Sequence, residues 1–337
     1  MKPTMQDVAD LAQVSRATVS RVLADSANVS QDKRAIVLAA VQKLGYKPHK
    51  KFRNQHRLFI CISPTQKTDP FSHDIIKGIK TGIHTFRAKH DIEFLGEEQA
   101  SADQRLPASI LDPLGQADGL VILGNLPLTE QQLLLHDRKI PAVIIHGVGS
   151  SEVFSYIGID ERRAMLEIVS ELAQLGHKRI GYIHGPEDCL DHQERLRAFK
   201  LGLLSSRLPV DSSLVVFSSD WDQESGYKAA SALLTTAAPS AIITANDQLA
   251  LGVYRAAEEL GWKIPEELSV VGFGDLACAQ HAQPPLSTIS VPLESIGKWA
   301  VALVCANIAD SDFSPVRLTV PASYRRRNSV AGVNYTP

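Results

Sequence analysis

The 337-residue chain is poor in cysteine, in aromatic residues and in long apolar stretches. Its four cysteines (Cys61, Cys189, Cys278 and Cys305) are far apart in the sequence. Zinc and redox sites use closely spaced pairs such as C-x-x-C, so this distribution argues against both kinds of site. We interpret the cysteines as free thiols in the core. We expect neither a metal nor a cofactor.

Membrane, export and catalytic signals are absent as well. No apolar run approaches the length that spans a bilayer, and the N-terminus lacks the apolar segment of a signal peptide, which predicts a cytoplasmic protein without membrane contact. The sequence contains no GxGxxG after an apolar strand, no GxxxxGK followed by Ser or Thr, no HExxH and no GxSxG. Carboxylates such as Asp160, Asp220 and Asp222 are more typical of caps and turns than of a catalytic pair. We therefore do not expect an enzyme.

Charge is divided unevenly along the chain. Residues 1–57 contain 11 Lys and Arg against 4 Asp and Glu, whereas the remainder contains 24 against 33, although the net charge of the whole is only −2. A basic N-terminal segment on an acidic body is typical of a protein whose N-terminus contacts a polyanion such as DNA. The hydrophobic content of 44% is ample for one or two buried cores in the remainder.

The first 46 residues have the pattern of three short helices. Thr4 is a good N-cap, and Asp7 stands three residues later, where it can reach back to the free amides of the first helix. After a break, Ser15 can cap a second helix. A third helix is predicted to start after Ser30 and to end at Gly45. This spacing is typical of a helix-turn-helix DNA-binding domain.

The second helix carries the residues expected to contact DNA bases. Its apolar positions 19, 22 and 23 face inward, which leaves Arg16 and Arg21 on the outer face. An arginine can donate two hydrogen bonds to the edge of a guanine, while hydroxyl groups and helix N-termini hold phosphates. The expected contacts in this region are Thr4, Ser15, Arg16, Ala17, Thr18, Ser20, Arg21, Asn28 and Ser30. The alternative is an ordinary surface cap of three helices whose arginines are only solvated.

From residue 58 onward, short β-rich runs alternate with helical stretches. This alternation predicts βαβ units, with buried parallel strands and crossover helices. Two open parallel sheets that face each other place a ligand cleft at the carboxyl ends of their strands. The expected strands are residues 58–62, 119–123, 142–145, 179–183, 241–243 and 268–273, and the expected helices are residues 72–89, 162–175, 193–204, 224–234 and 248–260.

Seven segments together resemble the LacI/GalR family of bacterial transcription regulators. They follow the family's order and extend over almost the whole chain: Asp7–Ala9, Val14–Leu23, Val29–Ser30, Leu44–Pro48, Leu175–Ile180, Ala245–Gly252 and Ser269–Phe273. The resemblance implies an all-α helix-turn-helix head joined to an α/β body of two open parallel-sheet lobes, similar to a periplasmic sugar-binding protein. It places the head at residues 1–46, a basic connector at 47–57, the body at 58–330 and a tail at 331–337. Lobe one is expected at about 58–157 plus 290–318, and lobe two at about 158–289 plus 319–330.

The connector departs from the family pattern. Family members carry Asn-x-x-Ala-Arg-x-Leu here, a hinge helix whose leucine enters the minor groove. This connector has no such leucine and is shorter by about three residues. Phe52 is its one large apolar residue, and both a minor-groove wedge and packing against the body are open to it. We expect Lys50 and Lys51 to bind phosphates, so that the connector contributes mainly electrostatic attraction.

The resemblance also implies an effector site between the lobes. Trp221 stands in a polar loop where no apolar stripe explains it, and its flat face can pack on a sugar or a base, with core packing as the alternative. Arg195 holds the family's effector-arginine position, with an exposed helical arginine as the alternative. Asn246 can be both a helix cap and a ligand contact. The expected effector contacts are Phe71, Asn125, His146, Arg195, Trp221, Asn246 and Asp275.

Two carboxylates of the family pattern are missing. Gly274 replaces an aspartate of the family's Gly-Phe-Asp-Asp, which leaves Asp275 as a substitute, and His146 stands where relatives often have aspartate. We expect a small sugar or sugar derivative as the ligand, and the reduced negative charge admits an acidic or phosphorylated one.

These features predict a DNA-binding transcription regulator. We expect a repressor that binds a pseudo-palindromic operator as a homodimer and responds to a small sugar-like effector. No leucine heptad that would build a tetramer follows Arg325–Arg327. Two alternatives compete with this reading. One is a solute-binding or sugar-processing protein, which the basic head disfavours, and the other is a regulator that has lost effector binding and acts with protein partners.

Overall fold

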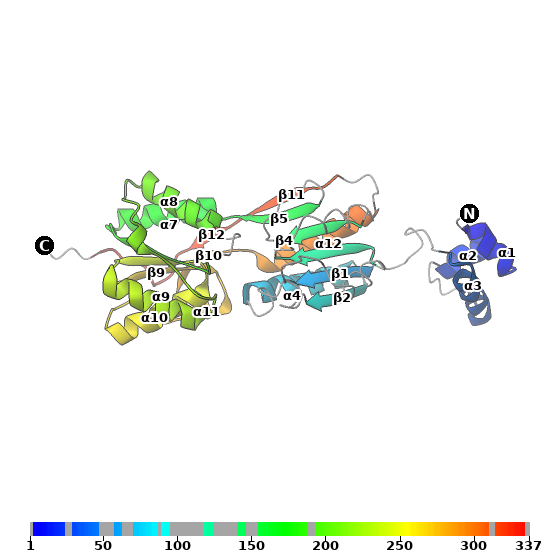
Figure 1. Ribbon diagram of the computed structural model, residues 1–337, viewed down its shortest axis with the longest axis horizontal. Coiled ribbons are helices and arrows are strands. Elements are labelled where there is room, and N and C mark those ends of the chain that lie inside the picture. Colours follow the sequence, from blue (N-terminus) through cyan, green and yellow to red (C-terminus); the bar gives the residue numbers. More distant parts are fainter. Residues whose placement is uncertain are drawn as a thin grey trace.

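The computed structural model describes residues 3–23, 29–46, 57–62, 70–86, 89–94, 117–124, 140–145, 154–187, 193–309 and 314–333. Figure 1 shows these residues as a small helical head and two α/β lobes. The predicted fold class, an all-α head with two open sheet lobes, is confirmed. Of the described helices, none is long and apolar enough to cross a membrane.

The head consists of α1 (Met5–Leu11), α2 (Arg16–Leu23) and α3 (Gln31–Leu44). Thr4 and Asp7 form the predicted capping box: the Asp7 N–H donates to Thr4 Oγ1, and the Thr4 N–H donates to Asp7 Oδ2. α3 ends at Gly45, whose φ of 60° is the left-handed conformation that glycine adopts without strain. The three helices enclose a core of their own, formed by Val8, Ala9, Ala12, Val19, Val22, Val37, Ala40 and Tyr46.

Lobe one is built on a parallel sheet with the strand order β11-β5-β4-β3-β1-β2. The strands are β1 (Arg57–Ile62), β2 (Lys89–Phe94), β3 (Gly119–Leu123), β4 (Ala142–Ile145), β5 (Ser155–Asp160) and β11 (Arg317–Pro321). Helices α4 (Pro70–Thr85) and α12 (Leu293–Ala309) pack against each other and contribute apolar residues to the core that includes one face of this sheet. The middle strands are buried on both faces, as their continuous apolar runs predict.

Lobe two repeats this plan with the strand order β12-β10-β9-β8-β6-β7. The strands are β6 (Ile180–His184), β7 (Val215–Phe217), β8 (Ala241–Thr244), β9 (Ser269–Gly274), β10 (Ser287–Ser290) and β12 (Ser323–Arg325). β12 is antiparallel to β10, and the other pairs are parallel. The helices are α7 (Arg162–Gln174), α8 (Gln193–Ser205), α9 (Gln223–Thr236), α10 (Asp247–Leu260) and the short α11 (Ala277–His281), with a 3-10 turn at Ser212–Leu214.

One predicted element ends in the wrong place. The helix expected at residues 72–89 ends at Thr85, and Lys89 begins β2 instead. β2 pairs in parallel with β1 along its whole length, so contacts with a distant strand decide the conformation of this polar segment. The expected lobe bounds at residues 157 and 318 fall inside β5 and β11, and both strands belong to the lobe-one sheet along their whole length.

The chain passes between the lobes three times. The crossings are Glu161 between β5 and α7, residues 291–292 between β10 and α12, and Ala322 between β11 and β12. We call these three connections the hinge segments. Lobe one is therefore assembled from three separate stretches of sequence, and the carboxyl ends of its parallel strands lead toward lobe two (Figure 1).

Each lobe contains a helix pair whose contact depends on glycine. In lobe one, a Cβ built on Gly78 of α4 would lie 2.0 Å from the backbone oxygen of Glu294, and one on Gly297 of α12 would lie 2.2 Å from the backbone oxygen of Ile75. In lobe two, Gly226 of α9 and Gly252 of α10 have the same role, with contacts of 2.5 Å and 2.3 Å to the facing backbone. These residues let the two helices of each pair approach backbone to backbone.

Candidate functional site

The outer face of α2 presents the side chains expected to contact DNA. Arg16, Ala17 and Arg21 are exposed, while Val19 and Val22 are buried against α1 and α3 and fix how α2 is rotated. Arg21 lies in the last turn of the eight-residue helix. Two guanidinium groups therefore extend from one short, well-anchored helix, which is the geometry of a major-groove reading element.

Several expected phosphate contacts also cap helices. Thr18 N–H donates to Ser15 Oγ at 3.1 Å, and the two hydroxyl groups of Ser15 and Thr18 are 2.9 Å apart. Thr4 Oγ1 lies 2.7 Å from Asp7 Oδ2, to which it donates. The exposed Ser30 makes no side-chain cap bond, and Ser20 is half-buried. Asn28, Lys50, Lys51 and Phe52 lie outside the described residues.

Arg195 is the central side chain of the expected effector site, but it is bonded within the protein. It lies on α8, its Nε donates to Glu161 Oε2 at 2.7 Å, and its Nη1 donates to the backbone oxygen of Ala245 at 2.6 Å. Its guanidinium carbon lies 3.5 Å from the centre of the Phe273 ring. Arg195 is only 2% exposed, so it is not the exposed helical arginine that the alternative envisaged.

Glu161 was missed by the sequence analysis. It lies in a hinge segment and is buried with Arg195, 34 residues away in the sequence. Burial raises the pKa of its carboxyl group, and the Arg195 charge opposes that rise. An acidic residue just before a helix reads as an ordinary first-turn residue, and no spacing in the sequence signals that α8 will lie opposite it.

Trp221 lies against the end of β6. A Cβ built on Gly185 would lie 2.0 Å from Trp221 Cη2, so the indole occupies space that only a glycine leaves open. The backbone oxygen of Trp221 accepts a 2.9 Å hydrogen bond from Asn246 Nδ2, while Asn246 Oδ1 accepts from the Leu249 N–H and caps α10. Trp221 is half-buried and packs against the core, as the alternative interpretation expected, and its role as a ligand contact stays a prediction.

Asp247, which was predicted with Asn246 to open a helix, is the first residue of α10. Its Oδ1 accepts from Thr288 Oγ1 at 2.6 Å, and its Oδ2 accepts from the Leu276 N–H at 2.7 Å. Burial raises its pKa to about 6, against the opposing effect of these two hydrogen bonds. Asp247 thus joins α10 to β10 and to the loop after β9.

β9 ends at Gly274 and is followed by Asp275, and both residues have positive φ (125° and 57°). Asp275, the expected substitute carboxylate, is paired with two arginines: Arg327 Nη2 lies 2.5 Å from its Oδ1, and Arg325 Nε lies 3.1 Å from its Oδ2. Its negative charge is therefore balanced by the C-terminal strand region.

Phe71 links the lobes. It lies in the first turn of α4 and is 7% exposed, and its ring centre is 6.2 Å from that of Phe273 in lobe two. Because Phe273 also lies beneath Arg195, Phe71, Phe273, Arg195 and Glu161 form one continuous buried set across the lobe boundary. The expected contacts Asn125 and His146 lie outside the described residues.

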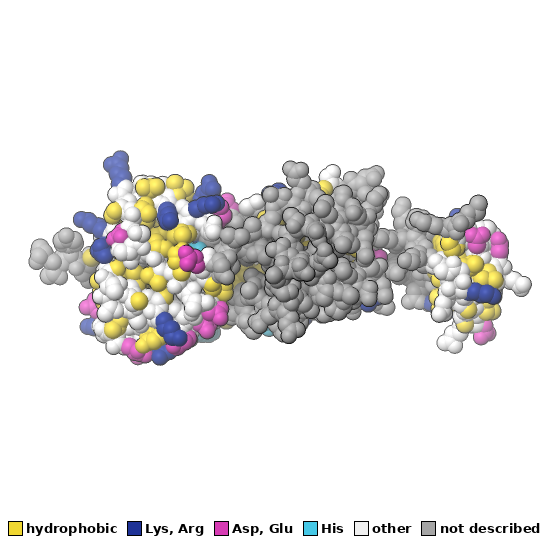
Figure 2. All heavy atoms as spheres, viewed as in Figure 1, with side chains coloured by type: hydrophobic (Ala, Val, Ile, Leu, Met, Phe, Trp, Pro, Cys, Tyr) yellow, Lys and Arg dark blue, Asp and Glu magenta, His cyan; other side chains and the backbone are white. Residues whose placement is uncertain are grey.

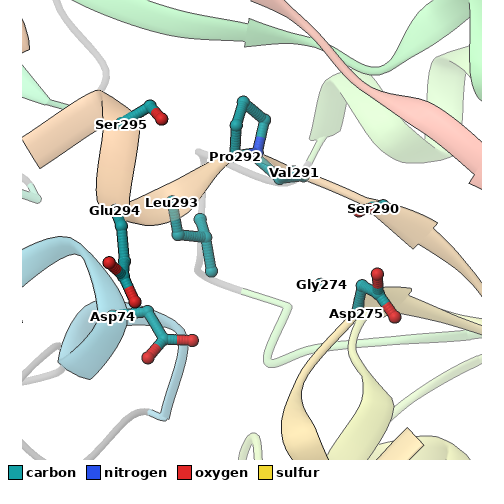
Figure 3. A pocket seen from close by; sticks show the side chains of 9 residues that line it. All are labelled: Asp74, Gly274, Asp275, Ser290, Val291, Pro292, Leu293, Glu294 and Ser295. Atoms are coloured by element: carbon teal, nitrogen blue, oxygen red, sulfur yellow. The ribbon is translucent and has the colours of Figure 1, made fainter. Parts of the chain in front are cut away.

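A pocket of about 230 Å³ opens between the lobes beside the hinge segment at residues 291–292. Figure 3 shows Asp74 on α4 and Glu294 on α12 at one side, and Asp275 at the other. Glu294 is paired with Lys77 at 2.5 Å. The remaining lining residues are Gly274, Ser290, Val291, Pro292, Leu293 and Ser295. Within the part of the chain that the structure describes, no group of three or more His, Cys, Asp or Glu side chains is arranged to hold a metal ion.

Comparison with known proteins identifies the family. Residues 4–49 match the family described as bacterial regulatory proteins, lacI family, and residues 169–330 match the periplasmic binding protein-like domain. The HTH-type transcriptional repressor CytR of Escherichia coli (strain K12) is 34% identical over 309 residues, which cover 89% of this chain and 88% of that protein. The chain belongs to the LacI family of bacterial regulatory proteins.

Solved structures of LacI-family proteins agree with this fold. The complex of the transcriptional regulator CelR with cellobiose has a TM-score of 0.71 at 29% identity, and the match covers 97% of this chain and 99% of that one. The lac repressor dimer bound to operator and the anti-inducer ONPF has a TM-score of 0.73 at 24% identity, covering 98% and 100%, and supports the fold alone. This LacI-family protein is a DNA-binding transcription regulator, and its relatives are regulators rather than enzymes.

Proposed function

We propose that this LacI-family protein is a repressor that binds a pseudo-palindromic operator as a homodimer and responds to a small sugar-like molecule between its lobes. One observation carries the proposal: the chain contains both a separate head and a two-lobed body. The head exposes Arg16 and Arg21 on α2, and three hinge segments join the two lobes of the body. A single head contacts too little of the groove for strong specificity, and two-fold operators favour two-fold proteins.

The second lobe supplies the features that favour a sugar. The half-buried indole of Trp221 offers a flat apolar surface in the polar loop after β7. The expected effector contacts Arg195, in the first turn of α8, and Asn246, the N-cap of α10, are both bonded to neighbouring backbone oxygens. CelR was solved with cellobiose in its complex. Ligand binding would change the DNA affinity by the difference in ligand affinity between two arrangements of the lobes, typically about 1 to 3 kcal/mol.

The DNA arm of the experiment selects an operator from random duplexes and compares Arg21→Ala with Lys33→Ala, which removes one positive charge from an exposed position of α3. Arg21→Ala is expected to lose about 1 to 3 kcal/mol of operator affinity and to relax the preference at one base pair. Lys33→Ala is expected to keep the ratio of operator to random-DNA binding. An unchanged ratio for Arg21→Ala would remove Arg21 from base reading.

The effector arm screens sugars, sugar acids, sugar phosphates and nucleosides by thermal shift, because a ligand at 100 times its Kd adds about 2.7 kcal/mol to the unfolding free energy. A stabilising compound is then titrated into the operator complex. Trp221→Ala is expected to lose the response and keep operator affinity, whereas Trp299→Ala, at an exposed tryptophan of α12, keeps both. A wild-type complex that ignores every stabilising compound would favour the alternative regulator that acts with protein partners.

A further inference from the structure

The charged groups around Arg195 are already balanced inside the protein. Arg195 Nε and Glu161 Oε2 are 2.7 Å apart, and the side chains are 3% and 8% exposed, respectively. Asp275 is balanced by Arg325 and Arg327, and Glu294 of the pocket by Lys77. Arg195, Arg325 and Arg327 thus each have a carboxylate partner within the protein.

We infer that Glu161 makes the effector site selective for an uncharged ligand, because its carboxylate neutralises the guanidinium of Arg195. This inference rests on the proposed function, in which Arg195 contacts the effector. It assigns a specificity-determining role to a residue of the hinge segment between β5 and α7. The class of effector is then a neutral, hydroxyl-bearing molecule rather than a sugar acid or a sugar phosphate.

The geometry explains why the carboxylate matters. Arg195 is held on three sides, by Glu161 at Nε, by the Ala245 backbone oxygen at Nη1 and by the Phe273 ring below, so it cannot turn away from Glu161 to meet a ligand. An anion at the outer edge of the guanidinium would be separated from the Glu161 carboxylate by little more than the width of that group. Coulomb energy falls only as the inverse of distance, so repulsion from the carboxylate cancels a large part of the attraction. A neutral hydroxyl group loses little binding free energy through the charge of Glu161, because its hydrogen bond with the guanidinium depends on contact geometry.

The pocket lining acts in the same direction. Asp74, Asp275 and Glu294 place carboxylates on both sides of its opening (Figure 3). A hydroxyl-bearing ligand can donate hydrogen bonds to these carboxylate oxygens. An ionised phosphate oxygen has no proton to donate and would lose its own water beside them without a replacement hydrogen bond.

The test uses the full-length protein and inorganic phosphate as a minimal anion. Unfolding temperature is measured over a range of phosphate concentrations, with sodium chloride of matched ionic strength as the reference. The variants are Glu161→Gln, which keeps a hydrogen-bond acceptor and removes the charge, and the double variant Glu161→Gln/Arg195→Gln, which removes both charges. The matched control is Glu194→Gln, an exposed glutamate next to Arg195 that is paired with Arg197.

Wild type, Glu194→Gln and the double variant are expected to respond to phosphate alike, whereas Glu161→Gln binds it at least tenfold more tightly. A phosphate response of wild type above that of the double variant overturns the inference, as does a folded Glu161→Gln that responds like wild type. If Glu161→Gln does not fold, the phosphate responses of the wild type and the double variant are compared. Equal responses support the inference, and a larger response of the wild type overturns it. The readout needs neither operator nor effector, so its failure is distinct from a failure of the proposed function, which appears as an operator complex that ignores every ligand.

Discussion

Gly274 is the clearest case of a single residue whose role depends on the fold. Its φ of 125° excludes most side chains, and a Cβ there would lie 3.5 Å from Asp247 Oδ2 and 3.6 Å from Phe71 Cδ2. An aspartate, as in the family pattern, would add a second carboxylate beside buried Asp247. The sequence showed that a carboxylate was missing. The sequence did not show that the carboxylate of Asp247 is buried beside the empty position.

Asp247 gives a pH dependence that can be measured. Its pKa rises from 3.8 unfolded to about 6 folded, so the folded protein binds the proton more tightly. The resulting stabilisation is complete below about pH 4 and is lost as the pH rises through 6, a loss of about 3 kcal/mol from the unfolding free energy. Asp247→Asn stays neutral and can still pair with Thr288. We therefore expect the unfolding free energy of Asp247→Asn, minus that of the wild type, to increase from pH 4 to pH 7. Chemical denaturation measures this difference.

Asp222→Asn is the control for that measurement, because hydrogen bonds from Ser225 lower the pKa of Asp222. Its stabilisation is present above the unfolded pKa of 3.8 and is lost as the pH falls through the lower folded pKa. The difference curve of Asp222→Asn should therefore be nearly level between pH 4 and pH 7 and slope the other way only below about pH 4. A flat difference curve for Asp247→Asn would show that Asp247 is charged in the folded protein across this range.

The paired helices α4 and α12 give a prediction about packing. Gly78→Ala would place a Cβ 2.0 Å from the backbone oxygen of Glu294, so the two helices must separate. We expect it to lower the unfolding free energy by about 1 to 3 kcal/mol despite the better helix propensity of alanine. Thr81→Ala, at an exposed position of α4, should change it by less than about 0.5 kcal/mol. Thermal melts compare the two, and equal melting temperatures would mean that the helices can adjust freely.

Elements with a strong apolar pattern could be predicted from the sequence, and elements whose conformation depends on distant partners could not. The apolar runs at β1, β3 and β9 predicted strands because burial on both faces leaves a continuous signal. β2 and β7 lie at sheet edges, and the half-polar sequence of β2 and the three residues of β7 give only a weak pattern. The same reason explains why only one member of the buried ion pair was predicted. Arg195 stands at the family's effector-arginine position, whereas its partner Glu161 is recognised only when α8 is packed beside the hinge segment.

The distribution of charge concerns the protein as a whole. Figure 2 shows acidic and basic side chains together along the edge of lobe two formed by α9 and α10, where Arg255 pairs with Glu224 and Glu259. Balanced surface pairs of this kind give the body little attraction for DNA. The excess positive charge of residues 1–57 is therefore expected to carry the salt dependence of operator binding.

This division predicts the effect of removing charge from the connector. Lys50→Gln/Lys51→Gln should reduce the slope of log affinity against log salt by about two units, because each phosphate contact contributes about 0.9. Lys200→Gln/Lys263→Gln removes the same charge from exposed positions of lobe two and should leave the slope unchanged. Fluorescence anisotropy with the selected operator at several salt concentrations measures both. A slope that falls equally in the two variants would assign the effect to net charge rather than to contacts.

The three hinge segments also determine the order in which a growing chain can be completed. The head has its own core within the first 46 residues, whereas the sheet of lobe one lacks β11 until residue 321 has been made, although β1 begins at Arg57. At ribosomal rates of about 5 to 20 residues per second, the head precedes a finished lobe one by some tens of seconds. During that interval a nascent chain carries a DNA-binding head on an incomplete body, so in the proposed homodimeric mode of binding single heads would meet DNA before paired ones exist. We therefore expect the first encounters of a new molecule with the genome to be weak and short-lived, and specific occupancy to begin only after β11 has completed lobe one.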